Sequence, residues 1–495
     1  MFKVTNESIE KHRTEALVVG LYEENKELQT IYQQLNDKLN GELDELVQSG
    51  DISNHNNSVS KVHTFSLIEA KRIYFIGLGK RDERTVHTVR KAFGKVFKQL
   101  SQDRIGQASI QLDSVITGEG QADYVEAIAE SMAMAPHQLQ TYHTERDEKS
   151  IELTNINYLT EQSAGVVEAA NTGYALGNGA NIARHLVNLP GNLLTASDLA
   201  TFAENIAAKH NIEIEVFDQA KIEEYGMGAL LAVNQGSEEP PRFIVMKYQG
   251  KEKWEDPVAF VGKGITFDTG GYSLKPKDGI IGMKMDMGGA ASVIGAMDAI
   301  GHIKPNENVM ALIPATDNMI SHTAYKPDDV IVSMSGKTIE VRNTDAEGRL
   351  AMADAVTYAR QNGAVKIVDV ATLTGGVVVA LGDQVTGAMT NNDDWLNEIK
   401  HASQQVDEPV WQLPYLDVYQ KQVRKSHIAD LNNSPGRKAH AVMAGCFVGA
   451  FAEDTPWVHL DIAGTAMADS EHDLGPKGPT GVMARTLAKA MMNVK

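Results

Sequence analysis

The chain has 495 residues, with 46 Lys and Arg against 65 Asp and Glu, a formal net charge of −19 and 42% hydrophobic residues. This composition is typical of a globular protein that is long enough to bury more than one core. The acidic balance argues against nucleic acid as the main partner, because binding to phosphates relies on basic groups. A single cysteine, Cys446, excludes an internal disulfide. No apolar run reaches the ~18 residues of a membrane span. We therefore expect a cytoplasmic protein with no membrane partner.

The first 160 residues predict a small α/β domain. Short apolar runs at 16–21 and 72–78 end at glycine or at charged residues, as buried strands do. A helical stretch at 90–100 follows them, which favours a mostly parallel sheet. We predict an N-terminal α/β domain over 1–160 and a linking helix over 161–187, where small and apolar residues alternate without a break.

Residues 188–495 predict a second, larger α/β domain. Apolar strand-like runs alternate with helical segments, and the runs lie at 243–246, 258–261, 309–313 and 365–370. In such sheets the active site lies at the carboxyl ends of the strands. The fold class predicted for the whole chain is therefore α/β, with two domains.

Three segments of this larger domain place ionisable side chains among glycines and apolar residues. They span 262–276, 283–291 and 343–350, and they contain Lys263, Asp268, Lys275, Asp286, Asp345, Glu347 and Arg349. Unpaired charges in an apolar setting are costly, so either mutual ion pairs or divalent metal ions must compensate for them. Asp345 and Glu347 are two residues apart, so an extended turn would direct both carboxylates to one side. Four carboxylates form an oxygen-rich site that could hold two divalent ions about 3.5–4 Å apart.

Several of the residues that the sequence singles out also have an ordinary structural interpretation. Asp286 could cap a helix that begins at Gly288, and Asp345 could cap one that begins near Leu350. A lone lysine such as Lys263 is more often a surface residue. Cys446 lies in an apolar helical context, which favours a small core residue over a nucleophile. The case for a site therefore depends on the joint occurrence of the charged residues.

At this point the sequence resembles a known family. The run Asn-Thr-Asp-Ala-Glu-Gly-Arg-Leu at 343–350 is similar to the signature of the leucine aminopeptidases, or cytosol aminopeptidases, which are dinuclear metallopeptidases. The segments 262–276, 283–291, 371–375 and 459–466 also resemble the family's pattern. The resemblance implies a macro-like N-terminal α/β domain and a C-terminal catalytic metallopeptidase domain, 188–495, with a mixed central sheet.

The resemblance also implies roles for the charged residues. The metal ligands would be Lys263, Asp268, Asp286, Asp345 and Glu347, with Lys275 and Arg349 catalytic. Asp268 and Glu347 would bridge two divalent ions, Mn²⁺ and/or Zn²⁺. A lysine ligand must be neutral, and burial beside two divalent charges would lower the lysine pKa. Lys275 would stabilise the oxyanion, and Arg349, which cannot act as a base, would hold a bicarbonate ion that carries the proton.

The implied function is a leucyl aminopeptidase, a hydrolase that releases leucine and other, mainly apolar, N-terminal residues from peptides. A water molecule that bridges the two ions would attack the peptide bond. Five residues would line an apolar pocket for the first side chain: Met283, Thr372, Gly375, Ala463 and Ala466. Their alternative interpretation is core packing. The family also implies a homohexamer.

A non-enzymatic binding role is the rival hypothesis. Macro-type domains bind nucleotides, and some relatives act as DNA-binding regulators. However, residues 1–160 contain no evident glycine-rich phosphate loop, and the net charge of −19 opposes DNA binding. The sequence therefore favours the peptidase, with any binding role an addition to it.

Overall fold

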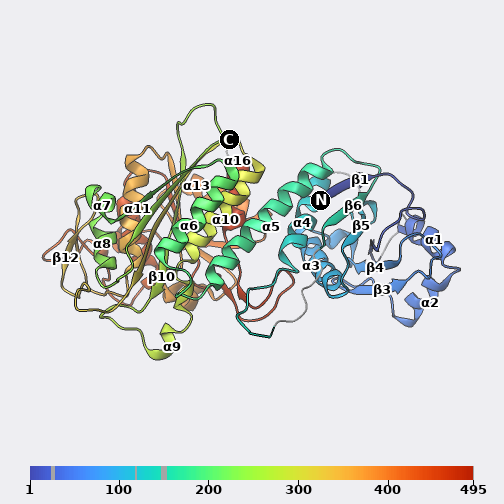
Figure 1. Ribbon diagram of the computed structural model, residues 1–495, viewed down its shortest axis with the longest axis horizontal. Helices are drawn as coiled ribbons and strands as arrows, with labels where there is room; N and C mark the ends of the chain where they lie inside the picture. The colour runs from blue at the N-terminus through green and yellow to red at the C-terminus, as the bar shows by residue number, and fades with distance from the viewer. Residues whose placement is uncertain (24–27, 117–119, 146–152, 494–495) are drawn as a thin grey trace. The chain divides into compact units, whose positions relative to one another are not determined.

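The computed structural model describes residues 1–23, 28–116, 120–145 and 153–493, and it divides into two compact units (Figure 1). Unit 1 comprises Met1–Asn178 and Glu471–Pro476, and unit 2 comprises Gly179–Ser470 and Lys477–Lys495. Each unit has its own sheet. No helix among the described residues is both long enough and apolar enough to cross a membrane.

Unit 1 is built on a six-stranded sheet. Its strands are β1 (Phe2–Thr5), β2 (Ala16–Leu21), β3 (Val59–His63), β4 (Arg72–Gly77), β5 (Gln107–Gln111) and β6 (Asn155–Leu159). They are arranged in the order β1-β6-β5-β2-β4-β3, and every pair is parallel except β3 with β4. Strand β2 is buried along its whole length, as its run of apolar residues predicts.

The helices of unit 1 complete two hydrophobic clusters around this sheet. They are α1 (Leu28–Lys38), α2 (Glu42–Ser49), α3 (Val86–Gln102) and α4 (Gln121–Met134), with short 3₁₀ turns at Arg81–Glu83 and Leu112–Ser114. Helices α3 and α4 pack against each other. The helix predicted at 90–100 lies inside α3, and the helix predicted over 161–187 corresponds to α5 (Val166–Asn188).

Unit 2 contains a nine-stranded mixed sheet. Its strands are β7 (Glu213–Phe217), β8 (Arg242–Gln249), β9 (Val258–Gly262), β10 (Gly264–Asp268), β11 (Asn308–Asn318), β14 (Lys366–Ala371), β15 (Thr386–Thr390), β16 (Val410–Gln412) and β18 (Trp457–Asp461). The order is β16-β15-β18-β14-β9-β11-β8-β7, with β10 paired to β11. Strands β9, β11, β14 and β18 are parallel to their neighbours in the centre, so their carboxyl ends meet at one edge.

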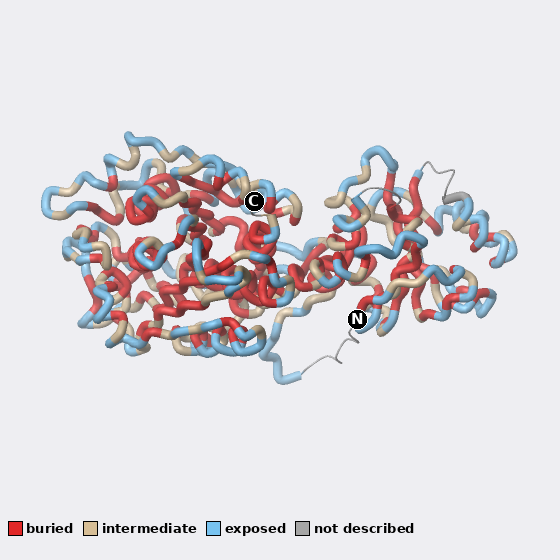
Figure 2. The backbone as a smooth tube through the Cα atoms, turned by 90° about the horizontal axis from the view of Figure 1, so that it is seen from above, coloured by how far each residue is buried: buried red, intermediate tan, exposed pale blue. Residues whose placement is uncertain are grey.

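Two groups of helices pack over the central strands of this sheet. One group is α6 (Ala196–His210), α10 (Gly288–Ile303) and α16 (Ala484–Asn493), which lie side by side, with α16 packed on α10 (Figure 1). The other is α8 (Gly228–Asn234), α11 (Gly348–Gln361) and α15 (His440–Ala452), which share a buried cluster with Ala259 and Val261 of β9. Because successive residues of a strand face opposite sides, the two groups cover the two faces of the sheet. Figure 2 shows buried residues in the interior of each unit and exposed residues mainly at its periphery. Strands β9, β15 and β18 are buried along their whole length.

The remaining elements of unit 2 lie outside the nine-stranded sheet and these two groups of helices. They are α7 (Gln219–Glu224), α9 (Lys277–Ile280), the 3₁₀ turn η3 (Met283–Met285), α12 (Gly375–Leu381), α13 (Asp393–Gln405), α14 (Asp417–Val423), the three-stranded sheet of β12 (Val330–Val332), β13 (Thr338–Glu340) and β17 (Leu431–Asn432), and the pair β19 (Met467–Ala468) and β20 (Gly478–Pro479). The predicted fold class, α/β with a smaller N-terminal part and a larger part built on a mixed sheet, is confirmed.

A buried ion pair joins α3 to α4 in unit 1. Arg90 Nε donates to Glu130 Oε2 at 2.9 Å, and neither side chain is more than 2% exposed. Removal of one partner of a buried pair takes away compensation for the charge that remains. We expect Glu130→Ala to lower the free energy of unfolding by about 3–5 kcal/mol, measured by urea denaturation.

The matched control for this prediction is Glu83→Ala, which breaks the exposed Lys80–Glu83 pair of the same unit. Exposed pairs contribute about 0–1 kcal/mol, so this variant should unfold close to the wild type. Equal losses for the two variants would contradict the assignment of stability to the buried pair. The double variant Arg90→Met/Glu130→Leu should recover most of the loss, because it removes both charges together.

Candidate metal centre

The site begins at the break between β9 and β10. Lys263 is the one residue between these strands; its N–H donates to Val370 O at 3.0 Å, and its carbonyl accepts from Ala290 N at 2.9 Å. The backbone is therefore held on both sides, by β14 and by the first turn of α10. The lysine side chain is 3% exposed, so the interpretation of Lys263 as a surface lysine is wrong.

Three carboxylates meet around this lysine. Asp268 ends β10, Asp286 lies between η3 and α10, and Glu347 immediately precedes α11. One carboxylate oxygen from each lies within 4.8 Å of the others, and all three residues are buried. Segments that are distant in the sequence thus place three acidic groups at the carboxyl edge of the sheet, where the sequence predicted them.

Lys263 lies between two of these carboxylates. Its Nζ is 2.8 Å from Asp286 Oδ1 and 2.9 Å from Glu347 Oε1, and it donates to the carbonyl of Thr372 at 3.1 Å. Burial alone lowers the pKa of Lys263, but the surrounding carboxylates outweigh burial and raise it. Burial also raises the pKa of Asp268, with the Glu347 carboxylate adding to the effect, to about 6.

Lys275 lies between the other two acidic groups. Its Nζ is 2.6 Å from Asp268 Oδ2 and 2.5 Å from Asp345 Oδ1. Asp345 therefore contacts Lys275 instead of joining the three clustered carboxylates directly. The whole set of predicted ligands is nevertheless connected, because Asp268 is shared between the cluster and Lys275.

The two helix-capping alternatives are also wrong. The residue that caps α10 is Met287, and the Asp286 carboxylate instead accepts from Lys263 and from the hydroxyl of Thr372 at 2.9 Å. The residue at the start of α11 is Glu347, whose side chain makes no capping hydrogen bond. These carboxylates point into the site and not at helix ends.

Arg349 follows in the first turn of α11 and is 2% exposed. Its Nη1 donates to the carbonyl of Asn433 at 2.7 Å, while its Nε has no hydrogen-bond partner among the described residues. Burial lowers the pKa of Arg349 to about 10, so the guanidinium remains charged at neutral pH. A buried cation with a free donor is suited to bind an anion.

A cavity of about 770 Å³ adjoins the signature turn. Asn343, from the signature, lines it together with Gly375, Val379 and His440. Of the five predicted pocket residues, Gly375 therefore faces this cavity.

The other four predicted pocket residues lie elsewhere around the site. Thr372 and Ala466 are buried beside Gly288, because a Cβ on that glycine would lie within 4 Å of both. Met283 and Ala463 are half-buried, at the start of η3 and just after β18. Cys446 is buried in α15, and burial raises the pKa of its thiol to about 12, as expected for a core cysteine.

Asn318 is a site residue that the sequence analysis missed. Its Nδ2 donates to Asp268 Oδ1 at 2.8 Å and to the carbonyl of Thr344 at 3.0 Å. Gly270, whose φ is +86°, also donates its N–H to Asp268 Oδ1. The signal for Asn318 is its place at the carboxyl end of a strand, but the apolar run at 309–313 ends five residues earlier.

The residues present fit a pair of divalent ions. Asp286 Oδ2 and Glu347 Oε2 are buried, and no described residue donates a hydrogen bond to either. Each of the two lysine ammonium groups lies between two carboxylates, in a position that would also suit a metal cation. Four carboxylates carry four negative charges, which two divalent ions would balance once Lys263 gave up its proton to become a ligand.

Both parts of the chain match models of one known protein family. Residues 181–488 match the model of the cytosol aminopeptidase family, catalytic domain, and residues 18–146 match the model of that family's N-terminal domain.

Solved structures give the same relationship. A mutant of tomato leucine aminopeptidase superposes with a TM-score of 0.88 at 30% identity, covering 100% of this chain and 96% of that one. The bottromycin maturation enzyme BotP gives a TM-score of 0.82 at 28% identity, covering 97% and 99%. BotP in complex with Mn gives 0.83 at 27% identity, with the same coverage.

Gly348 provides a test of the packing around Lys263. A Cβ at position 348 would lie 2.2 Å from Lys263 Cε, so the lysine must move if alanine replaces the glycine. We expect Gly348→Ala to lower the number of bound divalent ions per chain, measured by elemental analysis after dialysis. Gly375→Ala is the control, since its added Cβ would meet no described atom within 4 Å. Full metal content in Gly348→Ala would contradict this account.

His440 provides a test of pH dependence. Burial, with the charge of Arg349 adding to it, lowers the pKa of His440 to about 4. The unfolded chain has a histidine pKa of about 6.5 and so binds a proton that the folded chain refuses between these values. The contribution to stability is therefore complete above pH 6.5 and is lost as the pH falls towards 4. We expect His440→Gln to lose less unfolding free energy than wild type between pH 7 and 4.5 in urea titrations; parallel curves would contradict it.

Proposed function

This chain belongs to the cytosol aminopeptidase family and is a metal-dependent aminopeptidase; from that premise we propose that it releases leucine and other, mainly apolar, N-terminal residues from peptides. The observation that carries the proposal is the buried cluster of Asp268, Asp286 and Glu347 with Lys263 among them. In this cluster Asp286 Oδ2 and Glu347 Oε2 are buried without a hydrogen-bond donor, which would be unusual in a purely structural network.

The proposed ligands of two divalent ions are Lys263, Asp268, Asp286, Asp345 and Glu347. When bound, the ions would lower the pKa of a water molecule and so supply a nucleophile near neutral pH. Carboxylate-rich sites accept Mn²⁺ and Zn²⁺, and metal supply decides between them. Asn318 donates a hydrogen bond to Oδ1 of Asp268 and so holds this carboxylate in place. Oδ2 of Asp268, which contacts Lys275, is then available to bind an ion.

Lys275 is proposed to act on the substrate. The Lys275 side chain is 16% exposed, in contrast to the deeply buried Lys263. Once Asp268 and Asp345 serve as ligands, the Lys275 ammonium is available to donate to the carbonyl oxygen of the scissile bond. Such a donor stabilises the oxyanion that forms as the carbonyl is attacked.

Arg349 is proposed to hold an anion, such as bicarbonate, that carries the proton. Arginine itself stays protonated and cannot be the base. Its free Nε and its place two residues after Glu347, in the first turn of α11, put a fixed positive charge beside the carboxylates. Arg349 would hold a bicarbonate ion there, and the bound anion would supply a base for proton transfer.

Four further features are part of the proposal. Met283, Thr372, Gly375, Ala463 and Ala466 would form the pocket for the first side chain. The active form would be a homohexamer, and the compartment the cytoplasm, in keeping with a single cysteine. With a net charge of −19, nucleic acid would not be the main partner.

A second candidate function is the processing of one defined peptide instead of many. The similarity to a bottromycin maturation enzyme over 97% of this chain favours it. A panel of peptides that differ only in the first residue distinguishes the two. Hydrolysis of most apolar first residues supports the general aminopeptidase, and rejection of nearly all of them supports the specific one.

The roles of Asp268 and Lys275 are separable by mutation. Asp268→Ala should lose metal and activity together, because the residue is proposed to contact both ions. Lys275→Ala should keep about two ions per chain and lose kcat by on the order of 10²–10³-fold, as for removal of one oxyanion donor. Elemental analysis and hydrolysis of a leucyl anilide measure the two effects.

Lys277→Ala is the matched control for this pair, since Lys277 is exposed and lies two residues from Lys275. It should keep both metal and activity. Loss of metal from Lys275→Ala combined with its retention in Asp268→Ala would overturn the assignment.

A further inference from the structure

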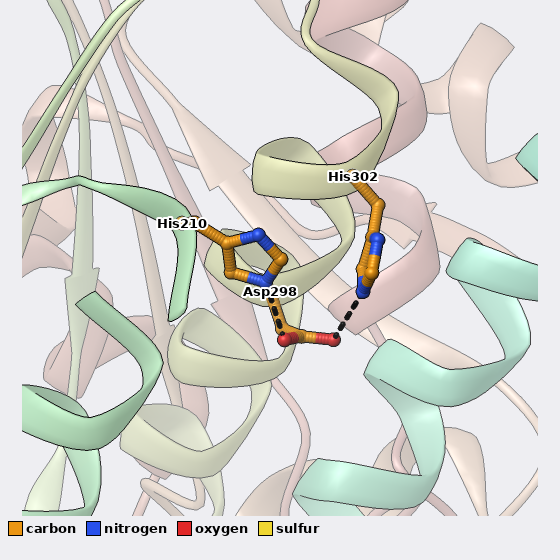
Figure 3. Close-up of side chains that lie close together, drawn as sticks. All are labelled: His210, Asp298 and His302. Carbon is orange, nitrogen blue, oxygen red and sulfur yellow. Dashed lines mark hydrogen bonds and ion pairs between the residues drawn. The ribbon is translucent and has the colours of Figure 1, made fainter. Parts of the chain in front are cut away.

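A second cluster of metal-ligand side chains lies away from the catalytic carboxylates. His210 is the last residue of α6, and Asp298 and His302 lie near the end of α10. Residues four apart on a helix share a face, so Asp298 and His302 are neighbours. Figure 3 shows the two imidazoles directed at the two oxygens of the Asp298 carboxylate. One ligand atom from each residue lies within 4.8 Å of the others.

The contacts within this cluster are unequal. His210 Nε2 is 2.7 Å from Asp298 Oδ1, a full hydrogen bond, whereas His302 Nε2 is 3.9 Å from Asp298 Oδ2. Asp298 is 1% exposed, and its Oδ2 has no hydrogen-bond partner among the residues that the structure describes. A buried carboxylate oxygen thus faces an imidazole nitrogen at a distance too long for a hydrogen bond.

The backbone is shaped to admit the His210 ring. A Cβ on Gly301 would lie 2.3 Å from His210 Cγ, so only glycine at this position lets the imidazole approach α10 so closely. The two rings are 4.6 Å apart, centroid to centroid, and inclined at 76°. Their nitrogens converge on the carboxylate without ring stacking.

The ordinary interpretation of the cluster is an ion pair with Lys209. Lys209 Nζ is 2.7 Å from Asp298 Oδ1, which compensates for the buried charge. However, this contact involves the oxygen that His210 already binds, and Oδ2 remains unpaired. The Lys209 side chain is 48% exposed, so it can move into solvent if another cation takes its place.

The chemistry of the three side chains suits a transition-metal ion. Two imidazoles and one carboxylate are a common ligand set for Zn²⁺, with distances of about 2.0–2.2 Å and a fourth position left for water. Metal ions bind the neutral form of imidazole, which predominates above the ordinary histidine pKa of about 6.5. His302 is 47% exposed, which gives an ion access from solvent.

We propose that His210, Asp298 and His302 form a third divalent-metal site, specific for borderline ions such as Zn²⁺, Co²⁺ or Ni²⁺ and independent of the catalytic pair. The ion joins the end of α6 to the end of α10 and stabilises unit 2. The rise along α10 from Gly288 to His302 is roughly 21 Å, at about 1.5 Å per residue, so the ion takes no part in the reaction. Imidazole ligands favour these ions over Mg²⁺ and Ca²⁺.

The test compares Co²⁺ binding by the full-length wild type and His302→Ala, both first loaded with Mn²⁺ and kept in excess Mn²⁺. Wild type should bind one more Co²⁺ per chain than the variant and show an added visible absorption band. Any exchange at the catalytic pair is common to both proteins and cancels in the difference. Peptidase activity should be equal in the two proteins, which also confirms that the variant is folded.

Two further variants sharpen this test. His401→Ala, at an exposed histidine of α13, is the matched control and should bind Co²⁺ as wild type does. Lys209→Met removes the competing cation and should tighten Co²⁺ binding severalfold. Added Co²⁺ should raise the melting temperature of wild type and of Lys209→Met more than that of His302→Ala. Equal Co²⁺ stoichiometry in wild type and His302→Ala, or weaker binding by Lys209→Met, would overturn the proposal.

Discussion

The concentration of negative charge at one buried edge of a sheet is the constraint on which the rest of unit 2 depends. Asp268, Asp286 and Glu347 lie within a few ångströms of one another and away from water. The free-energy cost of burying these charges without compensation would exceed the unfolding free energy of a whole domain. Lys263 and Lys275 supply that compensation in the metal-free chain, because each lies between two carboxylates. The two lysines thus balance the charge of the carboxylates, and divalent cations could replace them as partners of those carboxylates.

The position of Lys263 depends on the sheet and on two helices. The break between β9 and β10 directs its side chain out of the strand, and hydrogen bonds from both sides fix the backbone there. Gly289, at the start of α10, lets that helix approach β14, because a Cβ would lie 1.9 Å from the carbonyl of Val370. Gly348 does the same for the lysine itself. Gly289 and Gly348 are therefore explained by close packing.

Much of this arrangement could be predicted from the sequence, because the apolar runs show where the buried strands end. The runs at 258–261 and 365–370 correspond to β9 and β14, and Lys263 follows the first of these strands at their shared carboxyl edge. Asn318 was not predicted as a site residue, because the end of β11 is polar. This end of the strand pairs with β10, and hydrophobic periodicity gives no signal for that pairing. Asp345 was expected to point with Glu347 at a single position, yet Lys275 draws it to another. Such a contact joins residues 70 positions apart, so local spacing carries no signal for it.

The two groups of ligands in unit 2 differ in kind. The proposed catalytic cluster offers carboxylates and an amine, which accept hard and borderline ions alike, whereas the group at the far end of α10 offers imidazoles that favour borderline ions. Zn²⁺ is acceptable to both groups, and Mn²⁺ mainly to the first. A metal content of three with Zn²⁺ and two with Mn²⁺ would then reflect ligand chemistry and not partial occupancy of the catalytic pair. Metal dependence of activity and metal dependence of stability would accordingly follow different ions, because the first is set at the start of α10 and the second at its end.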